Sequence, residues 1–355
     1  MASISENLAW LGSLTRPIEA AKARGTMADL LTPFRPGVAN PGAIEAFIHV
    51  PEGLPPGAPL VVALHGCTQT AADYDHGTGW SQLADQLGFA LLVPQQSRGN
   101  NPNLCFNWFQ AADIARAGGE SESIANLTRA AIAAYAIDPA RVFVTGLSAG
   151  GAMTAVMLAT YPDIFAGGAV IGGLPYGCAT SVGDALQRMR GQGHAASRTA
   201  TDRARTASGG TVERWPTLSL WHGSRDTTVV PENMAALGRQ WRGLHDLPAQ
   251  PTTTDTGKGW THQRWQDSEG HDLVEEWRIE GMGHGVPIDP ATGYGSAAPY
   301  MLDVGLDSTA MIAAAWGLGT AAPRAVDAPQ SGRAPKAHDV TTTIENALRT
   351  AGLMR

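Results

Sequence analysis

The sequence predicts an α/β fold in which helices flank a mainly parallel sheet. Short apolar runs of strand length alternate with segments of helical spacing, which is the pattern of βαβ units. The 42 glycines and 23 prolines indicate many turns and long loops rather than a helical bundle. The chain has 355 residues, 43% of them hydrophobic, which is sufficient for a large buried core.

The first half of the chain contains the expected start of this sheet. Strands are expected at 43–51, 59–66, 89–96 and 141–148, with helices at 79–88 and 122–138. The second and third strands are continuously apolar, as strands buried on both faces are. Upstream, residues 3–31 have helical spacing and residues 32–42 are rich in Pro and Gly, so 1–42 is predicted to be a helical extension and linker.

The second half continues the alternation with one interruption. After a helix that ends near Pro162, the expected elements are strands at 165–173 and 217–223, a helix at 231–244, a hairpin at 261–281 and a helix at 308–319 that Ser308 caps. Residues 174–212 break the rhythm and are predicted to form a helical insertion or cap. The main α/β domain is therefore expected to span 43–319, followed by an Ala/Pro-rich linker and short helix over 320–355.

The segment TGLSAGGAM, residues 145–153, contains the best candidate for a nucleophile. Gly146, Ser148 and Gly150 form G-x-S-x-G between an expected strand and an expected helix, which is the context of a nucleophile elbow in α/β-hydrolases. Glycines at 146 and 150 remove side chains that such a sharp turn would not accommodate. The alternative is a glycine-rich turn without chemistry.

A serine nucleophile needs a histidine base, which in turn needs an orienting carboxylate. In the chain order of α/β-hydrolases, the acid and then the base follow the serine. Asp226 lies in the loop after the strand TLSLWHG, and His284 lies among glycines after the strand EEWRI. Asp226 and His284 are therefore the predicted acid and base; ordinary loop residues are the alternative.

Two backbone N–H groups are expected to form an oxyanion hole. The N–H of Ala149 lies at the start of the helix after the nucleophile, and the second donor should come from the loop after PLVVALHG. Cys67 is the first choice there and Thr68 the second, with His65 expected to hold the loop. A Cys67–Cys105 disulfide at this edge of the sheet is an open alternative to free thiols.

Three aromatic residues are candidates for substrate binding. Trp108 follows Cys105, Trp221 precedes the acid loop, and Tyr176 follows a strand end. An aromatic wall beside the nucleophile would suit a hydroxyalkanoate chain or an aryl ring. Burial in the core is the alternative for each of them.

Composition argues against several other classes of function. The net charge of −7 disfavours nucleic acid as a partner, and three scattered cysteines are too few for a zinc site. No metal ligands, phosphate-binding loop or cofactor motif are recognised, and no apolar run reaches the length of a membrane span. The N-terminal residues lack the pattern of a signal peptide, so a cytoplasmic location is expected, with a processed secreted form as the alternative.

Five separated motifs resemble the polyhydroxybutyrate depolymerase family, which is related to feruloyl and acetylxylan esterases. They are HGCTQTAADYD, CFNWF, the run around TGLSAGGAM, WHGSRDTTVVP and EEWRIEGMGHG. The resemblance covers about residues 43–318 and implies an α/β-hydrolase fold and cofactor-free ester hydrolysis. It places the triad on Ser148, Asp226 and His284, and the oxyanion donors on Cys67 and Ala149.

The expected function is therefore a serine esterase acting on poly- or oligo-(3-hydroxyalkanoate) esters. One alternative is a feruloyl or acetyl esterase. Another, from a different class, is a catalytically silent domain that only binds its ligand. No separate polymer-binding domain is recognised in the chain, so shorter or soluble esters are expected alongside polymer.

Overall fold

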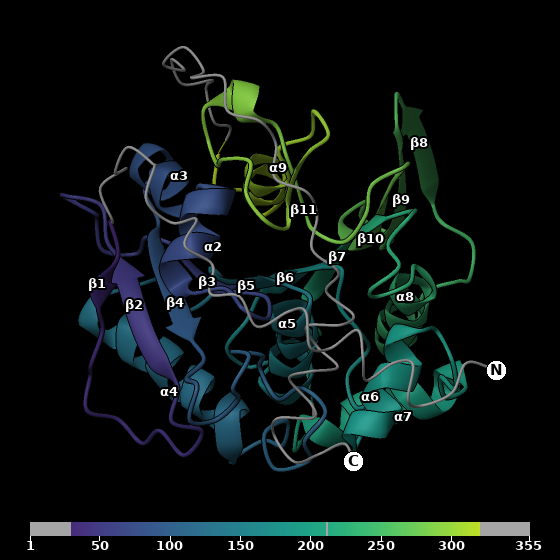
Figure 1. The fold of residues 1–355 in the computed structure, drawn as a ribbon, viewed down its shortest axis with the longest axis horizontal. Coiled ribbons are helices and arrows are strands. Elements are labelled where there is room, and N and C mark those ends of the chain that lie inside the picture. The colour runs from purple at the N-terminus through teal and green to yellow at the C-terminus, as the bar shows by residue number, and fades with distance from the viewer. Residues whose placement is uncertain (1–29, 211, 320–355) are drawn as a thin grey trace, which may run out of the picture. The chain divides into compact units, whose positions relative to one another are not determined.

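The computed structural model describes residues 30–210 and 212–319, and a ten-stranded sheet organises them. The strands run in the order β1-β2-β4-β3-β5-β6-β7-β10-β9-β8 (Figure 1). The six strands from β4 to β10 pair in parallel, and the strands outside them pair antiparallel. The strands of this sheet are β1 (Thr32–Pro33), β2 (Glu45–His49), β3 (Leu60–Leu64), β4 (Ala90–Gln95), β5 (Val142–Leu147), β6 (Gly167–Ile171), β7 (Thr217–Gly223), β8 (Thr253–Gly257), β9 (Trp260–Gln266) and β10 (Asp272–Ile279).

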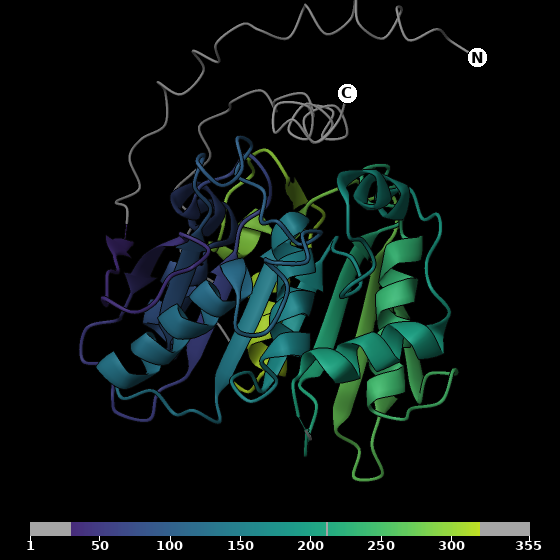
Figure 2. The ribbon, with the colours of Figure 1, turned by 90° about the horizontal axis from the view of Figure 1, so that it is seen from below.

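Helices cover both faces of the sheet because the central strands are apolar on both sides (Figures 1 and 2). In β3, for example, Val61 packs on one face and Val62 on the other. The first face is covered by α2 (Ala71–Thr78), α3 (Trp80–Leu87) and α9 (Ser308–Ala315), and the second by α4 (Gly119–Ala134), α5 (Ala149–Thr160) and α8 (Glu232–Leu244). None of the helices within the described ranges has the length and apolar character needed to cross a bilayer.

The predicted alternation is confirmed, and the structure adds several elements to it. The segment 174–212, predicted to be a helical insertion or cap, contains α6 (Val182–Met189) and α7 (Ser197–Ala207). The sequence analysis missed α2, β8 and a small parallel pair, β11 (Val286–Ile288) with β12 (Met301–Asp303), as well as the short 3-10 helix η1 (Pro290–Thr292). The expected terminal segments 3–29 and 320–355 lie outside the described residues.

Two local expectations are wrong. The supposed linker at 32–42 includes β1, in which Thr32 and Pro33 pair with β2 at the edge of the sheet, where a proline is tolerated. The cap of α9 is Asp307 rather than Ser308: the Asp307 side chain accepts a hydrogen bond from the N–H of Ala310, while the Ser308 hydroxyl donates to the carbonyl of Pro287. Aspartate one residue earlier is an equally good cap.

Candidate active site

The turn at Ser148 joins β5 to α5 and holds the serine in an unusual conformation. Ser148 has φ 57° and ψ −116°, a strained region for a residue with a side chain. A Cβ atom at Gly146 would lie 2.5 Å from the carbonyl carbon of Gly150, and one at Gly150 would lie 2.5 Å from the carbonyl oxygen of His65. Both glycines are therefore required by the close approach of backbone atoms, as the sequence suggested.

Asp226 and His284 meet at the carboxyl ends of two neighbouring strands, β7 and β10. Nδ1 of His284 lies 2.6 Å from Oδ2 of Asp226. Oδ1 of Asp226 accepts hydrogen bonds from the backbone N–H groups of Thr228 and Val229, each at 2.9 Å. Burial alone would raise the pKa of Asp226, but the charge and hydrogen bonds of His284 and His222 outweigh it and hold the pKa below the ordinary carboxyl value. The carboxylate is therefore ionised and fixed in place at neutral pH.

The other ring nitrogen of His284 is available for chemistry. Nε2 is buried and has no hydrogen-bond partner among the described residues. The ring packs beside Gly172, where a Cβ atom would lie 3.2 Å from Cε1 of His284. Ser148 donates its backbone N–H to the carbonyl of Ile171, the residue before Gly172. Ser148 and His284 therefore both contact the segment at the end of β6. The Ser148 Oγ and the His284 Nε2 form no hydrogen bond in this structure.

The oxyanion-hole candidates differ in whether their N–H groups are free. Among the described residues, the N–H groups of Cys67 and Ala149 have no acceptor. The N–H of Thr68, the second choice from the sequence, donates to the carbonyl of Asn103 at 2.7 Å. Thr68 is therefore the wrong choice, because its donor is already used.

His65 sets the direction of the Cys67 N–H through the intervening peptide. The His65 Nδ1 lies 2.8 Å from the carbonyl oxygen of Gly66, and its Nε2 accepts from the N–H of Gln96 at 3.1 Å. Burial lowers the pKa of His65 to about 4, so the ring is neutral and Nδ1 carries the proton. Because a trans peptide is planar, fixing the Gly66 carbonyl on one side turns the Cys67 N–H to the other.

A disulfide joins Cys67 to Cys105, which decides between the two alternatives left open by the sequence. It ties the loop after β3 to the loop that carries Trp108. Cys178 is the free thiol among the described residues, and burial raises its pKa to about 12. An inert Cys178 is the expected consequence.

Removing this disulfide should lower both stability and activity. The bridge spans a sequence separation of 38, for which the chain-entropy model assigns about 4 kcal/mol. We expect the double variant Cys67→Ser, Cys105→Ser to unfold at lower urea concentration and to show a lower kcat/KM. The matched control is Cys178→Ser, which keeps the bridge and should behave like the wild type. An unchanged unfolding midpoint in the double variant would contradict this expectation.

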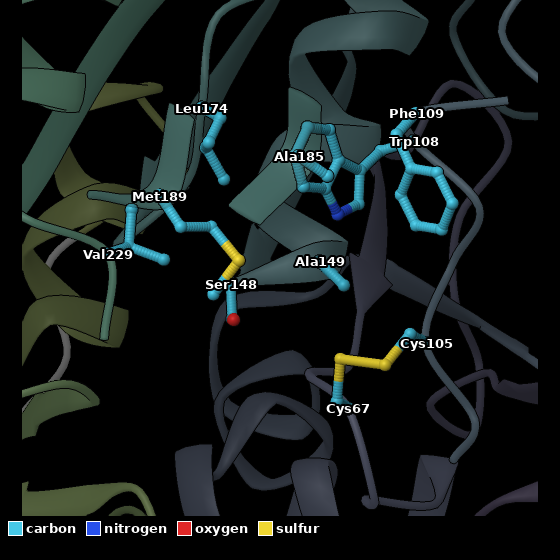
Figure 3. A pocket seen from close by; sticks show the side chains of 10 residues that line it. All are labelled: Cys67, Cys105, Trp108, Phe109, Ser148, Ala149, Leu174, Ala185, Met189 and Val229. Atoms are coloured by element: carbon cyan, nitrogen blue, oxygen red, sulfur yellow. A yellow bond between two sulfur atoms is a disulfide. The ribbon is translucent and has the colours of Figure 1, made fainter. Parts of the chain in front are cut away.

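Ser148 lies in a pocket with two apolar walls (Figure 3). One wall consists of Trp108, Phe109 and the disulfide. The rest of the lining is an aliphatic wall of Leu174, Ala185, Met189 and Val229, with Ala149 beside the serine. Figure 3 shows Leu174, Met189 and Val229 on the side away from Trp108. Ser148 is the one residue with a side-chain hydroxyl among the ten that line this pocket. The pocket therefore favours aliphatic or aromatic groups over hydroxyl-rich ones.

The residues 48–257 match the family model described as Esterase PHB depolymerase. The chain belongs to this family. The resemblance seen in the five sequence motifs is confirmed, and with it the α/β-hydrolase fold and the class of carboxylic ester hydrolases.

Several named proteins are similar to this PHB depolymerase family member. It is 46% identical over 282 residues to poly(3-hydroxyalkanoate) depolymerase C of Paucimonas lemoignei. This match covers 79% of this chain and 68% of that relative. An acetylxylan esterase of Coprinopsis cinerea is 36% identical, with 73% of this chain and 70% of the relative covered. Among solved structures, an acetyl xylan esterase from Aspergillus awamori superposes with a TM-score of 0.68 at 27% identity, covering 81% of this chain and 99% of that one.

Of the three aromatic residues predicted to contact substrate, this esterase places only Trp108 in the pocket of Ser148. Trp221 is 1% exposed and stacks on Trp277 in the core, with its Nε1 bonded to the Ser219 hydroxyl, so its predicted role is wrong. Its position on β7 directs the ring to the face covered by α2, α3 and α9. Tyr176 is also corrected: it packs on the core and lines a separate cavity with Cys178.

Sequence reasoning also missed residues that shape the site of this PHB depolymerase family member. One is His222 at the end of β7, whose Nε2 lies 2.6 Å from the carbonyl oxygen of Val229 and 3.4 Å from Oδ2 of Asp226. Ala185 and Met189 are four residues apart on α6, where that spacing places them on one face. The helical period within 174–212 could have revealed this pair. For His222, the available signal was its place four residues before the predicted acid Asp226.

Proposed function

We propose that this esterase hydrolyses hydroxyalkanoate esters, as oligomers or polymer, through an acyl-enzyme on Ser148. The observation that carries the proposal is the pocket itself, which offers an acyl chain apolar walls. Among its ten lining residues, only the Ser148 hydroxyl and the Trp108 indole N–H could form side-chain hydrogen bonds with a sugar. The relative at 46% identity, whose name is that of a poly(3-hydroxyalkanoate) depolymerase, supports the same substrate class.

The proposed reaction uses the residues in their predicted roles. Nε2 of His284 takes the proton of Ser148 as the serine oxygen attacks the ester carbonyl, and Asp226 fixes the tautomer through Nδ1. The free N–H groups of Cys67 and Ala149 stabilise the oxyanion. His284 then gives its proton to the departing alcohol, and water repeats the two steps to release the acid. No metal or cofactor enters this reaction as proposed.

Aryl-ester hydrolysis is the second candidate because Trp108 and Phe109 stand against each other in the pocket. Their ring centroids are 5.4 Å apart at an interplanar angle of 87°, an edge-to-face pair beside the nucleophile. A feruloyl ring could stack on either face. The catalytically silent alternative is disfavoured, since the family is one of esterases and the structural neighbour from Aspergillus awamori is an acetyl xylan esterase.

A panel of esters tests the substrate class. The rates on 3-hydroxybutyrate oligomers, p-nitrophenyl acyl esters of graded length, methyl ferulate and acetylated xylo-oligosaccharides should be compared. We expect the highest kcat/KM on the hydroxybutyrate oligomers. Preference for methyl ferulate or the acetylated sugar, with no attack on the oligomers, would overturn the proposal.

Filling the aliphatic wall should remove the longer acyl substrates first. Ala185 on α6 is 1% exposed and faces the pocket, so Ala185→Phe places a phenyl ring in the space of an acyl chain. We expect kcat/KM on p-nitrophenyl hexanoate to fall roughly 10-fold or more while p-nitrophenyl acetate is hydrolysed at nearly the wild-type rate. Gln187→Phe, on the exposed side of the same helix, is the control and should change neither rate. Equal loss on both esters would argue against an acyl pocket at Ala185.

The disulfide bears on location as well. Disulfides persist in oxidising compartments and are rare in the cytosol. We therefore propose that the protein acts in an oxidising compartment, in place of the cytoplasmic location expected from the sequence. Detection of free Cys67 and Cys105 thiols in protein alkylated inside its native cells would contradict this.

A further inference from the structure

A buried carboxyl group lies behind the site without a part in the reaction just described. Glu120, near the start of α4, is 1% exposed. Its Oε1 accepts hydrogen bonds from Nε2 of Gln96 at 2.5 Å and Nδ2 of Asn107 at 2.7 Å, and its Oε2 accepts from the backbone N–H of Asn107 at 2.8 Å. All of these partners are donors, so both oxygens of the Glu120 carboxyl group act as acceptors, which the terminal atoms of a glutamine could not both do.

The first group of contacts leads from Glu120 to the oxyanion hole. Gln96 is held by Glu120 through its side chain and by its own N–H to Nε2 of His65. His65 in turn bonds the Gly66 carbonyl, which sets the direction of the Cys67 N–H. Glu120 is thus connected to the proposed oxyanion donor through two side chains.

The second group of contacts leads to the aromatic wall. Asn107 gives both its backbone N–H and its side-chain amide to Glu120, and Trp108 is the next residue in the chain. Oδ1 of Asn107 accepts from Nδ2 of Asn101, so the amide orientation is set from both sides. The position of Trp108 in the pocket therefore depends on the same carboxylate.

Burying a carboxyl group at this position without a cation opposes stability. Burial, and then the charge of Asp113, raise the pKa of Glu120 to about 8, and no cation is among its hydrogen-bond partners. The nearest imidazole in the chain of contacts, His65, is neutral. Perturbed carboxyls of this kind gather at functional sites, where geometry is maintained at the expense of stability.

We propose that Glu120 is a positioning residue that fixes the oxyanion-hole peptide and the Trp108 wall as one unit. The inference rests on the proposed function, since it takes Cys67 and Trp108 in the roles given above. Glu120 touches no reacting atom in this scheme. It acts through Gln96 and His65 on one side and through Asn107 on the other.

The test is the near-isosteric variant Glu120→Gln, which turns one acceptor oxygen into an NH₂ group facing donors. We expect kcat on p-nitrophenyl acetate to fall roughly 10-fold or more, the scale of a weakened oxyanion donor, with KM nearly unchanged. On p-nitrophenyl hexanoate, KM should also rise because the displaced Trp108 wall contacts the longer chain. Circular dichroism and thermal unfolding give the fraction of each variant that is folded, and the rates are expressed per folded molecule.

Glu276→Gln is the matched control. Glu276 is also a buried carboxyl, 8% exposed, but it pairs with Arg242 at 2.6 Å and bonds no residue of the pocket. The Glu276→Gln variant should have lower stability than the wild type. Its kcat and KM should stay within about twofold of the wild type on both esters, because the site shares no partner with the pocket. A loss of kcat in Glu120→Gln that Glu276→Gln does not share supports positioning.

Unchanged kcat and KM per folded Glu120→Gln molecule would overturn the inference. Should that variant not fold, Gln96→Met removes the link to Glu120 yet keeps the backbone N–H to His65. The same loss of kcat on the acetate ester is then expected, and its absence would equally overturn the inference. The proposed function is judged separately: if Ser148→Ala stays active on these esters, that function fails, whereas an inactive Ser148→Ala beside an unaffected Glu120→Gln rejects the positioning role alone.

Discussion

Ser148→Ala is expected to lower kcat/KM on ester substrates by about 10⁴-fold or more, the scale seen when serine hydrolases lose their nucleophile. The loss follows from removing the one hydroxyl in the pocket. Folding should be retained, because the Ser148 Oγ makes no hydrogen bond to a described residue and alanine meets the same backbone strain at φ 57°. Hydrolysis of p-nitrophenyl butyrate and thermal unfolding measure the two effects.

Covalent labelling separates loss of the nucleophile from a general disturbance. A fluorophosphonate should add its mass to the wild type and to Ser197→Ala, an exposed serine on α7, but not to Ser148→Ala. Ester hydrolysis by Ser148→Ala at near wild-type rate, or labelling of that variant, would show that another residue is the nucleophile.

Asp226→Asn is expected to lower kcat/KM by roughly 10⁴-fold while the pocket walls stay in place. An asparagine has one acceptor oxygen and one NH₂ group in place of the two carboxylate oxygens. When its oxygen accepts from the Thr228 and Val229 N–H groups, its NH₂ group faces His284 and donates to Nδ1. It therefore favours the wrong tautomer of His284, with the proton on Nε2. Steady-state rates on p-nitrophenyl butyrate check this, and activity within tenfold of the wild type would contradict the role of Asp226.

Comparison of the same variant with the wild type should reveal how Asp226 makes the stability of the folded protein depend on pH. The pKa of Asp226 is lower in the folded protein than its ordinary value of 3.8, so its contribution to stability is present above that value and is lost as the pH falls through the folded pKa. The difference in Tm between the wild type and Asp226→Asn should therefore be larger at pH 6 than at pH 3. Asp246→Asn, at an exposed ion pair, is the control and should show little difference at either pH.

The positions of the central strands along the chain and the triad candidates could be predicted because each leaves a local signal. A buried parallel strand reads as an apolar run, and a turn as sharp as that at Ser148 requires glycines at 146 and 150, which the sequence shows directly. The acid and base follow strands β7 and β10 in chain order. These features depend on a few neighbouring residues.

What could not be predicted depends on contacts between distant segments. In the sequence, Trp221 and Trp108 have similar surroundings, each beside a loop that contains glycine or cysteine. The pleat of β7 turns Trp221 into the core, whereas Trp108 belongs to the loop between β4 and α4 and lines the pocket. The free N–H of Cys67 and the used N–H of Thr68 differ only because Asn103 approaches one of them. Glu120 carries no motif at all, since its partners come from 24 and 13 residues away.

The unequal tethering of the two pocket walls has a consequence for protein engineering. Trp108 shares a disulfide-tied loop and the Glu120 carboxylate with the oxyanion peptide, so a substitution there that widens the pocket also disturbs turnover. Ala185 and Met189 belong to α6, which has no such tie. A library intended to change which acyl group is accepted, without slowing the chemical step, should therefore diversify α6 and leave the loop of Trp108 intact.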